Sequence, residues 1–508
     1  MAGIFHFVTA RSLQELAQAL SLALPRSHTA KTAGSVLLLD TSTLALRQRN
    51  WLLILASESG DTSLSLRRLN HQTSLRAPAS GRLPLVVQNI NHRALRERLQ
   101  ARLGGSQLQV VQSWHVHGLR HECRNEDGKI ECTLLAQQYR APPPASLASP
   151  VLVELLPKRG YERETANLAQ ALLHQLPWSV LARDAFELLE DLSVAAATTQ
   201  RADAPPLRPA TATTTVASWL LDHHTMMCSS VAPGAAPEVE QLHDLRVAMR
   251  HSRSLLRAYR GTLGRELARH FQREFRWLST ATSLLRDIDV LHAALLELTA
   301  DYATLAQQER QALLSFLEQE RARGACRLQG VLDGNRYRRL RRTWPLALAA
   351  LINLAPYDAP SIAAPAAAAI GKALARLQRD IIAVESHHSP SVVHELRKQC
   401  KRVRYLVVPC ASLYPREQIA AVQSGLRQLQ SVLGECCDRY AQLTLFEGHL
   451  WRCAKGHTVV RAALRSARLA LRQKLDVSDV GFVLGALQEF EDGRYTATLE
   501  SLLKMPDL

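Results

Sequence analysis

The sequence has few aromatic residues and lacks the common motifs of nucleotide-binding and hydrolytic enzymes. Aromatic residues make up only 5% of the chain, and a low aromatic content with many Ala and Leu residues favours helices over strands. We find no Walker-type or dinucleotide-binding glycine loop and no G-x-S-x-G motif. The sequence therefore predicts no catalytic residue of these classes and no cofactor.

Cysteine pairs at metal-binding spacing and long apolar runs are missing as well. The nine cysteines include no C-x-x-C pair, and Cys436 and Cys437 are adjacent, which indicates reduced thiols and neither a disulfide framework nor a thiolate zinc site. Residues 1–9 lack a basic stretch followed by an apolar one, so we expect no signal peptide. The most apolar tract, residues 345–370, is interrupted by prolines and polar residues and predicts a linker or a helix pair. We therefore expect a cytoplasmic protein without membrane insertion.

Acidic residues are too few to balance the basic ones. The 508 residues include 62 Lys and Arg against 46 Asp and Glu, a formal net charge of +16. Such an excess indicates a polyanionic partner: nucleic acid, an anionic membrane surface or a phosphate polymer. The chain is too long for one ordinary hydrophobic core, so we expect two or three domains.

Local patterns divide the chain into an N-terminal part of strands and helices and a C-terminal helical part. Residues 62–67 alternate between polar and apolar, as in a half-buried strand, and residues 125–128 (Asn-Glu-Asp-Gly) are a hairpin turn signal. The expected fold class is α+β, an antiparallel β domain with helices followed by an all-α domain. The expected boundaries are residues 1–192 for the first domain, 193–210 for an Ala/Thr/Pro-rich linker, 211–477 for the helical domain with repeats over 217–350 and 368–477, and 478–508 for a C-terminal helical extension.

The helical part contains an internal repeat. Leu-His-Asp-Leu-Arg at 242–246 returns as Val-His-Glu-Leu-Arg at 393–397, 151 residues later. Within the repeat, Arg250 matches Lys401, Arg253 matches Arg404, and Asp287 and Asp438 each follow their histidine by 44 residues. A repeat of this length predicts a duplicated helical bundle packed about a pseudo-twofold axis.

Each repeat places its cations on one face of a helix. At 100° per residue, Arg246, Arg250, Arg253 and Arg257 fall within about 60° of one another, near His243. In the second repeat Arg397, Lys401 and Arg404 align in the same way with His394. The opposite faces are apolar and consist of Leu245, Met249, Leu255, Leu256 and Tyr259 in the first repeat and Leu396, Cys400, Val403, Leu406 and Val407 in the second. Both helices can therefore bury one side and present a row of cations on the other.

A solvent-exposed charged face is the simplest interpretation of one such row. Exposed faces usually mix signs, because each like-charge pair one turn apart costs about 0.2–0.5 kcal/mol. The row from 246 to 257 contains no acidic residue and occurs twice, which favours an anion-binding function. Arg side chains bind phosphate oxygens bidentately. Nucleic-acid readers usually add aromatic stacking platforms, whereas Tyr259 and Tyr405 lie off the rows, so a phosphate polymer fits better.

The repeat histidines, His243 and His394, lie near the expected starts of their helices, where backbone N–H groups and the helix dipole favour anions. A neutral imidazole there can donate to a phosphate and become charged when the anion raises its pKa. A local hydrogen bond is the alternative. The basic clusters at 336–342 and 372–379 extend the path only if nearby acids leave them free.

The phrases LHDLRVAMRHSRSLLRAY, LLRDIDVL, NRYRRL, VHELRKQCKRVRYL and LQSVLGECCD resemble the CHAD family, the conserved-histidine α-helical domain, over residues 211–477. The resemblance implies two four-helix bundles with a basic groove that binds inorganic polyphosphate, without catalysis. The resemblance also suggests association with polyphosphate granules in the cytoplasm. The residues carried over are His243, Arg246, Arg250, Arg253, His394, Arg397, Lys398, Lys401 and Arg404, to which the helical pattern adds Arg257.

The N-terminal part is similar to the CYTH family, a triphosphate tunnel that hydrolyses short polyphosphates with Mg²⁺ or Mn²⁺. Its opening E-x-E-x-K strand reads Gly-Ile-Phe-His-Phe-Val here (residues 3–8), and its R-x-R strand reads Leu-Ile-Leu (residues 53–55). Only Glu154 and Arg67 remain of the expected charges. Because tunnel chemistry needs carboxylates for the metal, we expect a degenerate tunnel without activity. A metal-dependent inorganic triphosphatase and a nucleic-acid-binding protein remain the alternatives.

Histidine pairs occur outside the repeat. They are His115 with His117 and nearby His121, His223 with His224, and His387 with His388. None has a carboxylate or thiolate partner at ligand spacing, so we predict surface histidines and no metal site. The sequence leaves the oligomeric state open.

Overall fold

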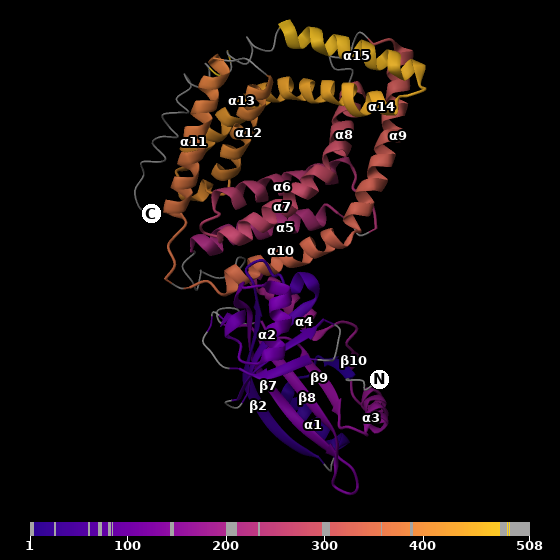
Figure 1. Ribbon diagram of the computed structural model, residues 1–508, viewed down its shortest axis with the longest axis vertical. Helices are drawn as coiled ribbons and strands as arrows, with labels where there is room; N and C mark the ends of the chain where they lie inside the picture. Colours follow the sequence, from indigo (N-terminus) through magenta and orange to yellow (C-terminus); the bar gives the residue numbers. More distant parts are fainter. Residues whose placement is uncertain are drawn as a thin grey trace. The chain divides into compact units, whose positions relative to one another are not determined.

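The computed structural model describes residues 5–24, 27–58, 61–69, 74–79, 83, 85–142, 147–199, 211–231, 234–296, 305–356, 358–386, 390–477, 485 and 487. The chain divides into two units, shown in Figure 1. The sheet unit takes Met1–Ser218 and Arg342–Ala359, and the helical unit takes Trp219–Arg341 and Pro360–Leu508. The expected C-terminal extension lies outside the described residues, apart from Gly485 and Leu487.

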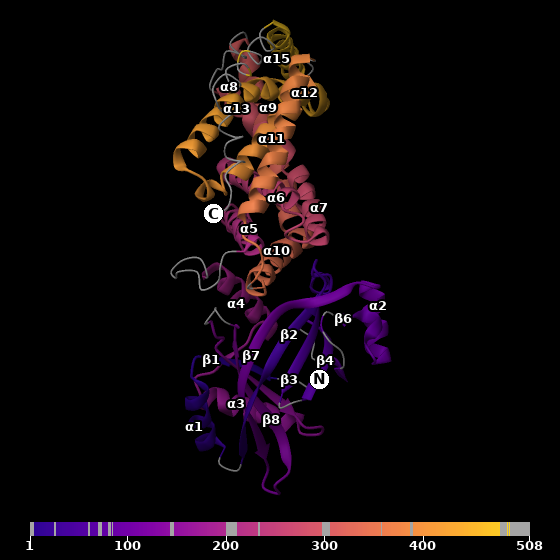
Figure 2. The same cartoon turned by 90° about the vertical axis from the view of Figure 1, so that its left-hand side faces the viewer.

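The sheet unit contains an antiparallel sheet in the order β10-β1-β9-β8-β7-β2-β3-β4-β5, with β6 paired to β7 (Figure 2). Its strands are β1 Phe5–Thr9, β2 His28–Asp40, β3 Trp51–Glu58, β4 Asp61–Arg68, β5 Ser74–Pro78, β6 Leu85–Val86, β7 Gln107–Arg124, β8 Ile130–Arg140, β9 Val151–Pro157 and β10 Ser179–Val180. Its helices are α1 Leu13–Ala23, α2 Arg93–Leu103, α3 Glu162–Gln175 and α4 Ala185–Thr199. The sheet fits the tunnel-type fold that the sequence resemblance implied.

Local sequence explains several of these elements. Leu64 and Leu66 are buried while their neighbours on β4 are more exposed, as the alternating pattern predicted. The predicted hairpin joins β7 to β8, and Gly128 adopts a positive φ of 76°, which glycine tolerates best. Helix α1 begins with a capping box in which Ser12 and Glu15 bond each other's backbone N–H.

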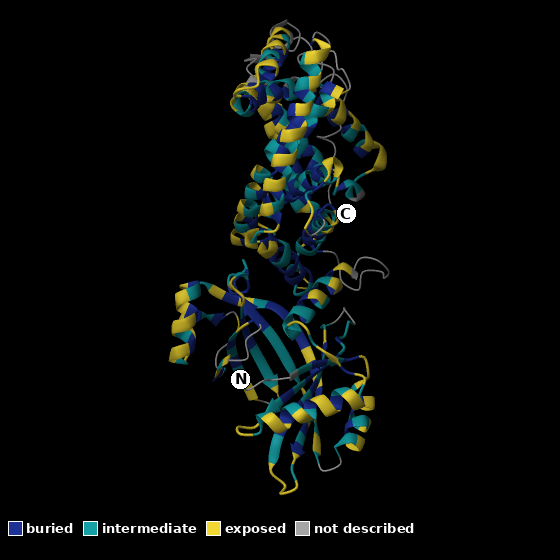
Figure 3. Ribbon diagram, turned by 90° about the vertical axis from the view of Figure 1, so that its right-hand side faces the viewer, coloured by how far each residue is buried: buried dark blue, intermediate teal, exposed yellow. Residues whose placement is uncertain are grey.

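Helices cover both faces of the strands β7–β9. Leu134 and Val153 face one side and pack with α1 and α3. Tyr139 and Leu152 face the other side and pack with α4. Most residues of β8 and β9 are buried or intermediate, and Figure 3 shows these two colours over most of the visible strands of the sheet unit. Glu154 lies between Val153 and Leu155 on β9, so its side chain lies on the opposite face from theirs, which is the face that α4 covers. This is the face on which the expected tunnel would carry its charges.

The first part of the expected linker is helical, because it belongs to α4. This helix continues to Thr199, so residues 193–199 are helical, and residues 200–210 lie outside the described residues. Ala196 and Ala197 are fully buried, and the Asn353 side chain donates a hydrogen bond to the Ser193 carbonyl. Packing therefore extends the helix into an Ala-rich segment that composition alone assigned to a linker.

The helical unit is built from long helices, and two of them, α5 and α10, have residues in both units. The helices are α5 Ala212–Ser229, α6 Val239–Ala258, α7 Arg265–Ala281, α8 Ser283–Leu296, α9 Gln307–Leu332, α10 Asn335–Asn353, α11 Ala363–Ser386, α12 Pro390–Val407, α13 Arg416–Leu445, α14 Trp451–Cys453 and α15 Thr458–Val477. A π-helical turn, Phe446–Leu450, joins α13 to α14. The expected α+β fold class is confirmed, and the apolar tract 345–370 contains the end of α10 and the start of α11. No described helix is long and apolar enough to cross a membrane.

Candidate anion-binding site

Helices α6 and α12 carry the two basic rows and bury their opposite faces as predicted. The residues of the two apolar faces are all buried, at 2% exposure or less. Of the row residues, only Arg257, His394 and Lys398 are exposed, and the other cations are intermediate. The rows are therefore held against the protein surface and are not extended into solvent.

The two helices pack against each other about a pseudo-twofold relation. The rings of His251 on α6 and Tyr405 on α12 lie 4.0 Å apart, and the Tyr259 hydroxyl lies 3.6 Å from the Cys410 sulfur. Three pairs of positions that are 151 residues apart are neighbours: Tyr259 with Cys410, Arg250 with Lys401, and Asp287 with Asp438. Equivalent positions meet in this way only near a twofold axis. The two basic rows therefore meet at Arg250 and Lys401.

The first arginine of each row is anchored by its guanidinium tip. Arg246 Nη1 donates to the Thr282 hydroxyl at 2.9 Å and to the Ser279 carbonyl at 3.2 Å. Arg397 Nη1 lies 3.1 Å from the Asp438 carboxylate. No described residue accepts a hydrogen bond from the buried Nε atoms of Arg246, Arg250 and Arg397. The equivalent arginines of the two repeats thus both keep a buried donor without an acceptor.

Burial and like charges act together on these cations. Burial, followed by the neighbouring Arg397 and Arg250, lowers the pKa of Lys401 to about 8. Burial also lowers the pKa of Arg246 to about 10, with Arg250 as the next cause. Positive charges that are partly desolvated and close together destabilise one another. An anion placed among them would relieve this repulsion.

The segment that contains both rows matches a known family. The family model of the CHAD domain matches residues 220–447. Residues 220–447 are a CHAD domain. The comparison with curated proteins gave no match.

Several solved structures are similar to parts of the chain. The CHAD domain from the plant Ricinus communis is 19% identical, with a TM-score of 0.47, over 55% of this chain and 93% of that one. PptA from Streptomyces chartreusis is 14% identical, with a TM-score of 0.40, over 55% of this chain and all of that one. A Hippeastrum protein with a dominant triphosphatase activity is 17% identical, with a TM-score of 0.27, over 37% of this chain and 94% of that one.

Two acidic residues of the CHAD domain lie at the basic rows, although neither row contains an acid. Asp438 pairs with Arg397. Burial raises the pKa of Asp287, and the nearby Arg246 lowers that pKa by a smaller amount. The stretch from 246 to 257 contains no acid, as the sequence shows, but α8 and α13 bring Asp287 and Asp438 to the basic rows from other parts of the chain. The signal was present in the sequence, since both aspartates follow their histidine by 44 residues.

A further cation, Arg286, joins the CHAD site from α8. It is close enough to lower the pKa values of His243 and Arg246, in both cases after the larger effect of burial. Sequence reasoning missed it because it lies outside the two predicted rows. Arg257 in turn approaches Arg253 and also Arg402 of α12, so the cations continue across the two helices.

The repeat histidines lie one turn inside their helices, which begin at Val239 and Pro390. Burial is the largest cause that lowers the pKa of both imidazoles. The start of α6 is already supplied with negative charge by Glu238 at the N-cap and Glu240 in the first turn. The N–H groups at the start of α6 are therefore less open to an anion than we expected from the sequence. The His243 imidazole itself remains as a hydrogen-bond donor for the anion.

Some of the other cations in the helices are paired with acids. Arg336 bonds Glu274 at 2.8 Å and lies over the Trp277 ring. Arg342 pairs with Glu187 and Glu190 in the sheet unit. Lys398 in the CHAD domain bonds Glu395, one turn earlier, at 2.7 Å. These cations are less available to a ligand than Arg250 of the first row, whose Nε has no acceptor among the described residues.

In the sheet unit, both charges carried over from the tunnel family have partners inside the protein. Arg67 forms two hydrogen bonds of 2.6 Å with Asp184. Glu154 lies 3.3 Å from His6, its register partner on β1, and this hydrogen bond raises the pKa of His6. Arg67 is therefore neutralised before any phosphate arrives.

The histidines outside the repeat have different environments. His115 and His117 are exposed, as predicted, whereas His387 and His388 lie outside the described residues. His121 is 1% exposed and bonds the hydroxyls of Ser27 and Thr29, so the prediction of a surface residue was wrong. It lies on the covered face of β7, where hydroxyl groups replace water.

Proposed function

We propose that the CHAD domain binds inorganic polyphosphate along the joined basic rows of α6 and α12. The observation that carries the proposal is the pair of equivalent arginines, Arg246 and Arg397, whose buried Nε atoms have no acceptor among the described residues. A buried donor without a partner costs about 1–3 kcal/mol. Phosphate oxygens are strong acceptors that guanidinium groups bind bidentately.

A polymeric anion suits this site because the cations form a path through both repeats. Arg250 and Lys401 lie near each other at the centre, and each row continues away from them along its own helix. Successive cations on a helix face are about 5.4 Å apart along its axis. A single small anion would neutralise only part of this path, whereas a chain of phosphates can follow it from one repeat to the other.

Nucleic acid is the competing polyanion, and the tyrosines of the site weigh against it. Tyr259 and Tyr405 are 2% and 4% exposed, and the Tyr405 ring packs on His251. Proteins that bind single strands usually offer exposed aromatic rings on which bases stack. The described parts of α6 and α12 offer no such ring, which supports a ligand made of phosphate alone.

For the sheet unit we propose no triphosphatase activity. Arg67 is bound to Asp184, and Glu154 is bound to His6, so each charge that would hold phosphate or metal is already engaged with another side chain. Assays of the full chain with tripolyphosphate and Mg²⁺ or Mn²⁺ should release no phosphate above the blank across a range of pH. Metal-dependent release that follows enzyme concentration would contradict this proposal.

We further propose that the protein acts in the cytoplasm and associates there with polyphosphate granules. The described cysteines are free thiols, in keeping with a reducing compartment. Fluorescent fusions that colocalise with a polyphosphate dye in wild-type cells, and lose this pattern in cells that lack polyphosphate, would support the location. A pattern that is the same in both cells would contradict it.

The test of binding uses the full chain and fluorescent long-chain polyphosphate in a salt series, with unlabelled DNA as competitor. We expect affinity to fall steeply with salt, because binding releases counterions, and excess DNA to displace the probe poorly. Arg250→Glu and Lys401→Glu should each weaken binding at least tenfold, since each places an anion at the centre of the path. Arg98→Glu and Lys455→Glu make the same charge changes at exposed positions away from the rows and should retain binding. Equal losses in both sets would refute the site, and stronger displacement by DNA would favour a nucleic-acid ligand.

A further inference from the structure

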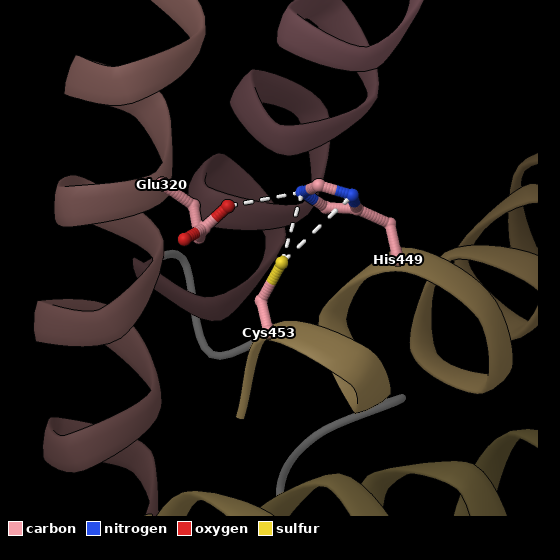
Figure 4. A group of neighbouring side chains, drawn as sticks. All are labelled: Glu320, His449 and Cys453. Carbon is pink, nitrogen blue, oxygen red and sulfur yellow. Dashed lines mark hydrogen bonds and ion pairs between the residues drawn. The ribbon is translucent and has the colours of Figure 1, made fainter. Parts of the chain in front are cut away.

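A second cluster of chemistry-bearing side chains lies in the helical unit, on elements that do not contribute to the basic rows. Glu320 comes from α9, His449 from the π-helical turn after α13, and Cys453 from the end of α14 (Figure 4). The ligand atoms of these three residues all lie within 4.8 Å of one another. Among the described residues they are the group of His, Cys and acidic side chains with metal-ligand spacing.

The geometry centres on one nitrogen. His449 Nε2 lies 2.9 Å from Glu320 Oε2 and 3.6 Å from Cys453 Sγ. In a tetrahedral zinc site with bonds of about 2.0–2.3 Å, neighbouring ligand atoms are about 3.3–3.8 Å apart. The observed separations are close to that range, so small side-chain movements would admit an ion. A single N–H bond, in contrast, cannot point at both the oxygen and the sulfur.

An ordinary buried ion pair explains the cluster less well. Glu320 is 1% exposed, and its other oxygen, Oε1, already accepts a hydrogen bond from Arg323. A second cation from a protonated His449 is therefore not needed to neutralise the carboxylate. The bond from Arg323 is of the kind that orients a metal-ligating carboxylate from outside the coordination shell. Oε2 stays directed at the imidazole and the thiol (Figure 4).

The local backbone is also unusual at this point. His449 belongs to the π-helical turn, Phe446–Leu450, which interrupts the long α13. Turns of this kind are uncommon and often mark functional sites, because the extra residue changes the direction of the side chains that follow. Here the turn places His449 and Cys453 on the side that faces α9. Buried apolar residues surround the cluster, including Leu317, Leu450 and Ala454.

We propose that Glu320, His449 and Cys453 bind one zinc ion. Thiolate, imidazole and carboxylate together are ligands of Zn²⁺, and three protein ligands leave a fourth position for water or a small ligand. The ion links two segments that are 129 residues apart in sequence. It thereby ties α9 to the α13–α14 connection inside one hydrophobic core. The proposal does not depend on polyphosphate binding.

The test uses the full chain without a polyhistidine tag, stripped with a chelator and titrated with ZnCl₂. We expect one Zn²⁺ per chain, and Co²⁺ in its place should give the intense visible bands of a tetrahedral site with a thiolate charge-transfer band. Cys453→Ser and His449→Asn should weaken zinc binding by about 100-fold or more, beyond the typical effect of losing an outer-shell partner. Cys326→Ser removes an exposed thiol on α9 and is the matched control. Absence of binding to the wild type, or unchanged binding and cobalt spectrum in Cys453→Ser, would overturn the proposal.

A measurement on the wild type covers the case in which the variants do not fold. Iodoacetamide labelling, read by peptide mass spectrometry, should modify Cys453 more slowly when Zn²⁺ is present and leave the rate at Cys326 unchanged. Equal rates at Cys453 with and without zinc would contradict a thiolate ligand. Polyphosphate binding by Cys453→Ser should match the wild type, so the two proposals fail independently.

Discussion

Replacing Asp438 by asparagine should strengthen polyphosphate binding and at the same time weaken the fold. The carboxylate of Asp438 lies 3.1 Å from Arg397 Nη1 and competes with an incoming phosphate for that guanidinium. The substitution would keep the shape of the side chain and remove its charge. A ligand would then meet an arginine that has lost its internal counterion.

The magnitude follows from the exposure of the pair. The Arg397 side chain is 19% exposed and that of Asp438 is 47% exposed. Two unit charges 4 Å apart near a protein surface attract with about 4 kcal/mol before solvent and side-chain entropy are considered. Measured pairs with an exposed partner retain about 0.2–1 kcal/mol. At about 1.4 kcal/mol per tenfold change, the upper part of this range corresponds to about two- to fivefold tighter binding.

The assay is the fluorescent polyphosphate titration at fixed ionic strength, paired with urea denaturation of the same protein. Asp438→Asn should lower the dissociation constant by about two- to fivefold and lower the free energy of unfolding by less than about 1 kcal/mol. Asp191→Asn removes an equal charge from the exposed Arg183–Asp191 pair in the sheet unit and should leave binding unchanged. Binding that is weakened by Asp438→Asn, or strengthened equally by both substitutions, would refute the reasoning.

Two further predictions concern protonation and the sheet unit. Polyphosphate binding should weaken steadily from pH 6 to pH 9 at constant ionic strength, by up to about tenfold per pH unit for each linked proton. Burial lowers the pKa values of the repeat histidines and, with its cationic neighbours, that of Lys401 to about 8, whereas a bound anion favours the charged forms of all three. A dissociation constant independent of pH would show that none of these groups touches the ligand. Glu190→Gln removes the carboxylate that bonds the buried guanidinium of Arg47 and leaves Glu187 as an acidic neighbour at 3.8 Å, so it should lower the free energy of unfolding of the sheet unit by up to about 3–5 kcal/mol. Urea denaturation followed by tryptophan fluorescence measures this loss, and the exposed Glu97→Gln is the control, for which no change is expected.

Sequence periodicity was sufficient for the parts of the site that lie within one helix. The rows of α6 and α12 follow from the spacing of Arg and Leu residues along a continuous segment, and their apolar faces are buried as expected. The acids Asp287 and Asp438 lie on other helices, so their approach to the rows depended on tertiary packing. A helical wheel contains no information about neighbouring helices.

The proposed zinc ligands also depend on the packing of helices that are far apart in the sequence. His449 and Cys453 are four residues apart, a spacing that the sequence alone displays. Glu320 is 129 residues away and becomes a neighbour only when α9 packs against the α13–α14 connection. In the sheet unit, by contrast, the leucines at 95, 99 and 103 indicate α2 by their helical spacing within one segment.

Helix α10 limits where the chain can be divided. Its residues up to Arg341 belong to the helical unit, and those from Arg342 belong to the sheet unit, where Arg342 pairs with Glu187 and Glu190. A truncated protein that begins at Thr211 would retain Arg342–Ala359 and lose α4, which supplies those partners. Such a fragment would expose apolar surface that is covered in the full chain and would be prone to aggregate. Exchange of either half between related proteins should therefore carry residues 342–359 with the N-terminal half, although they lie far beyond it in the sequence.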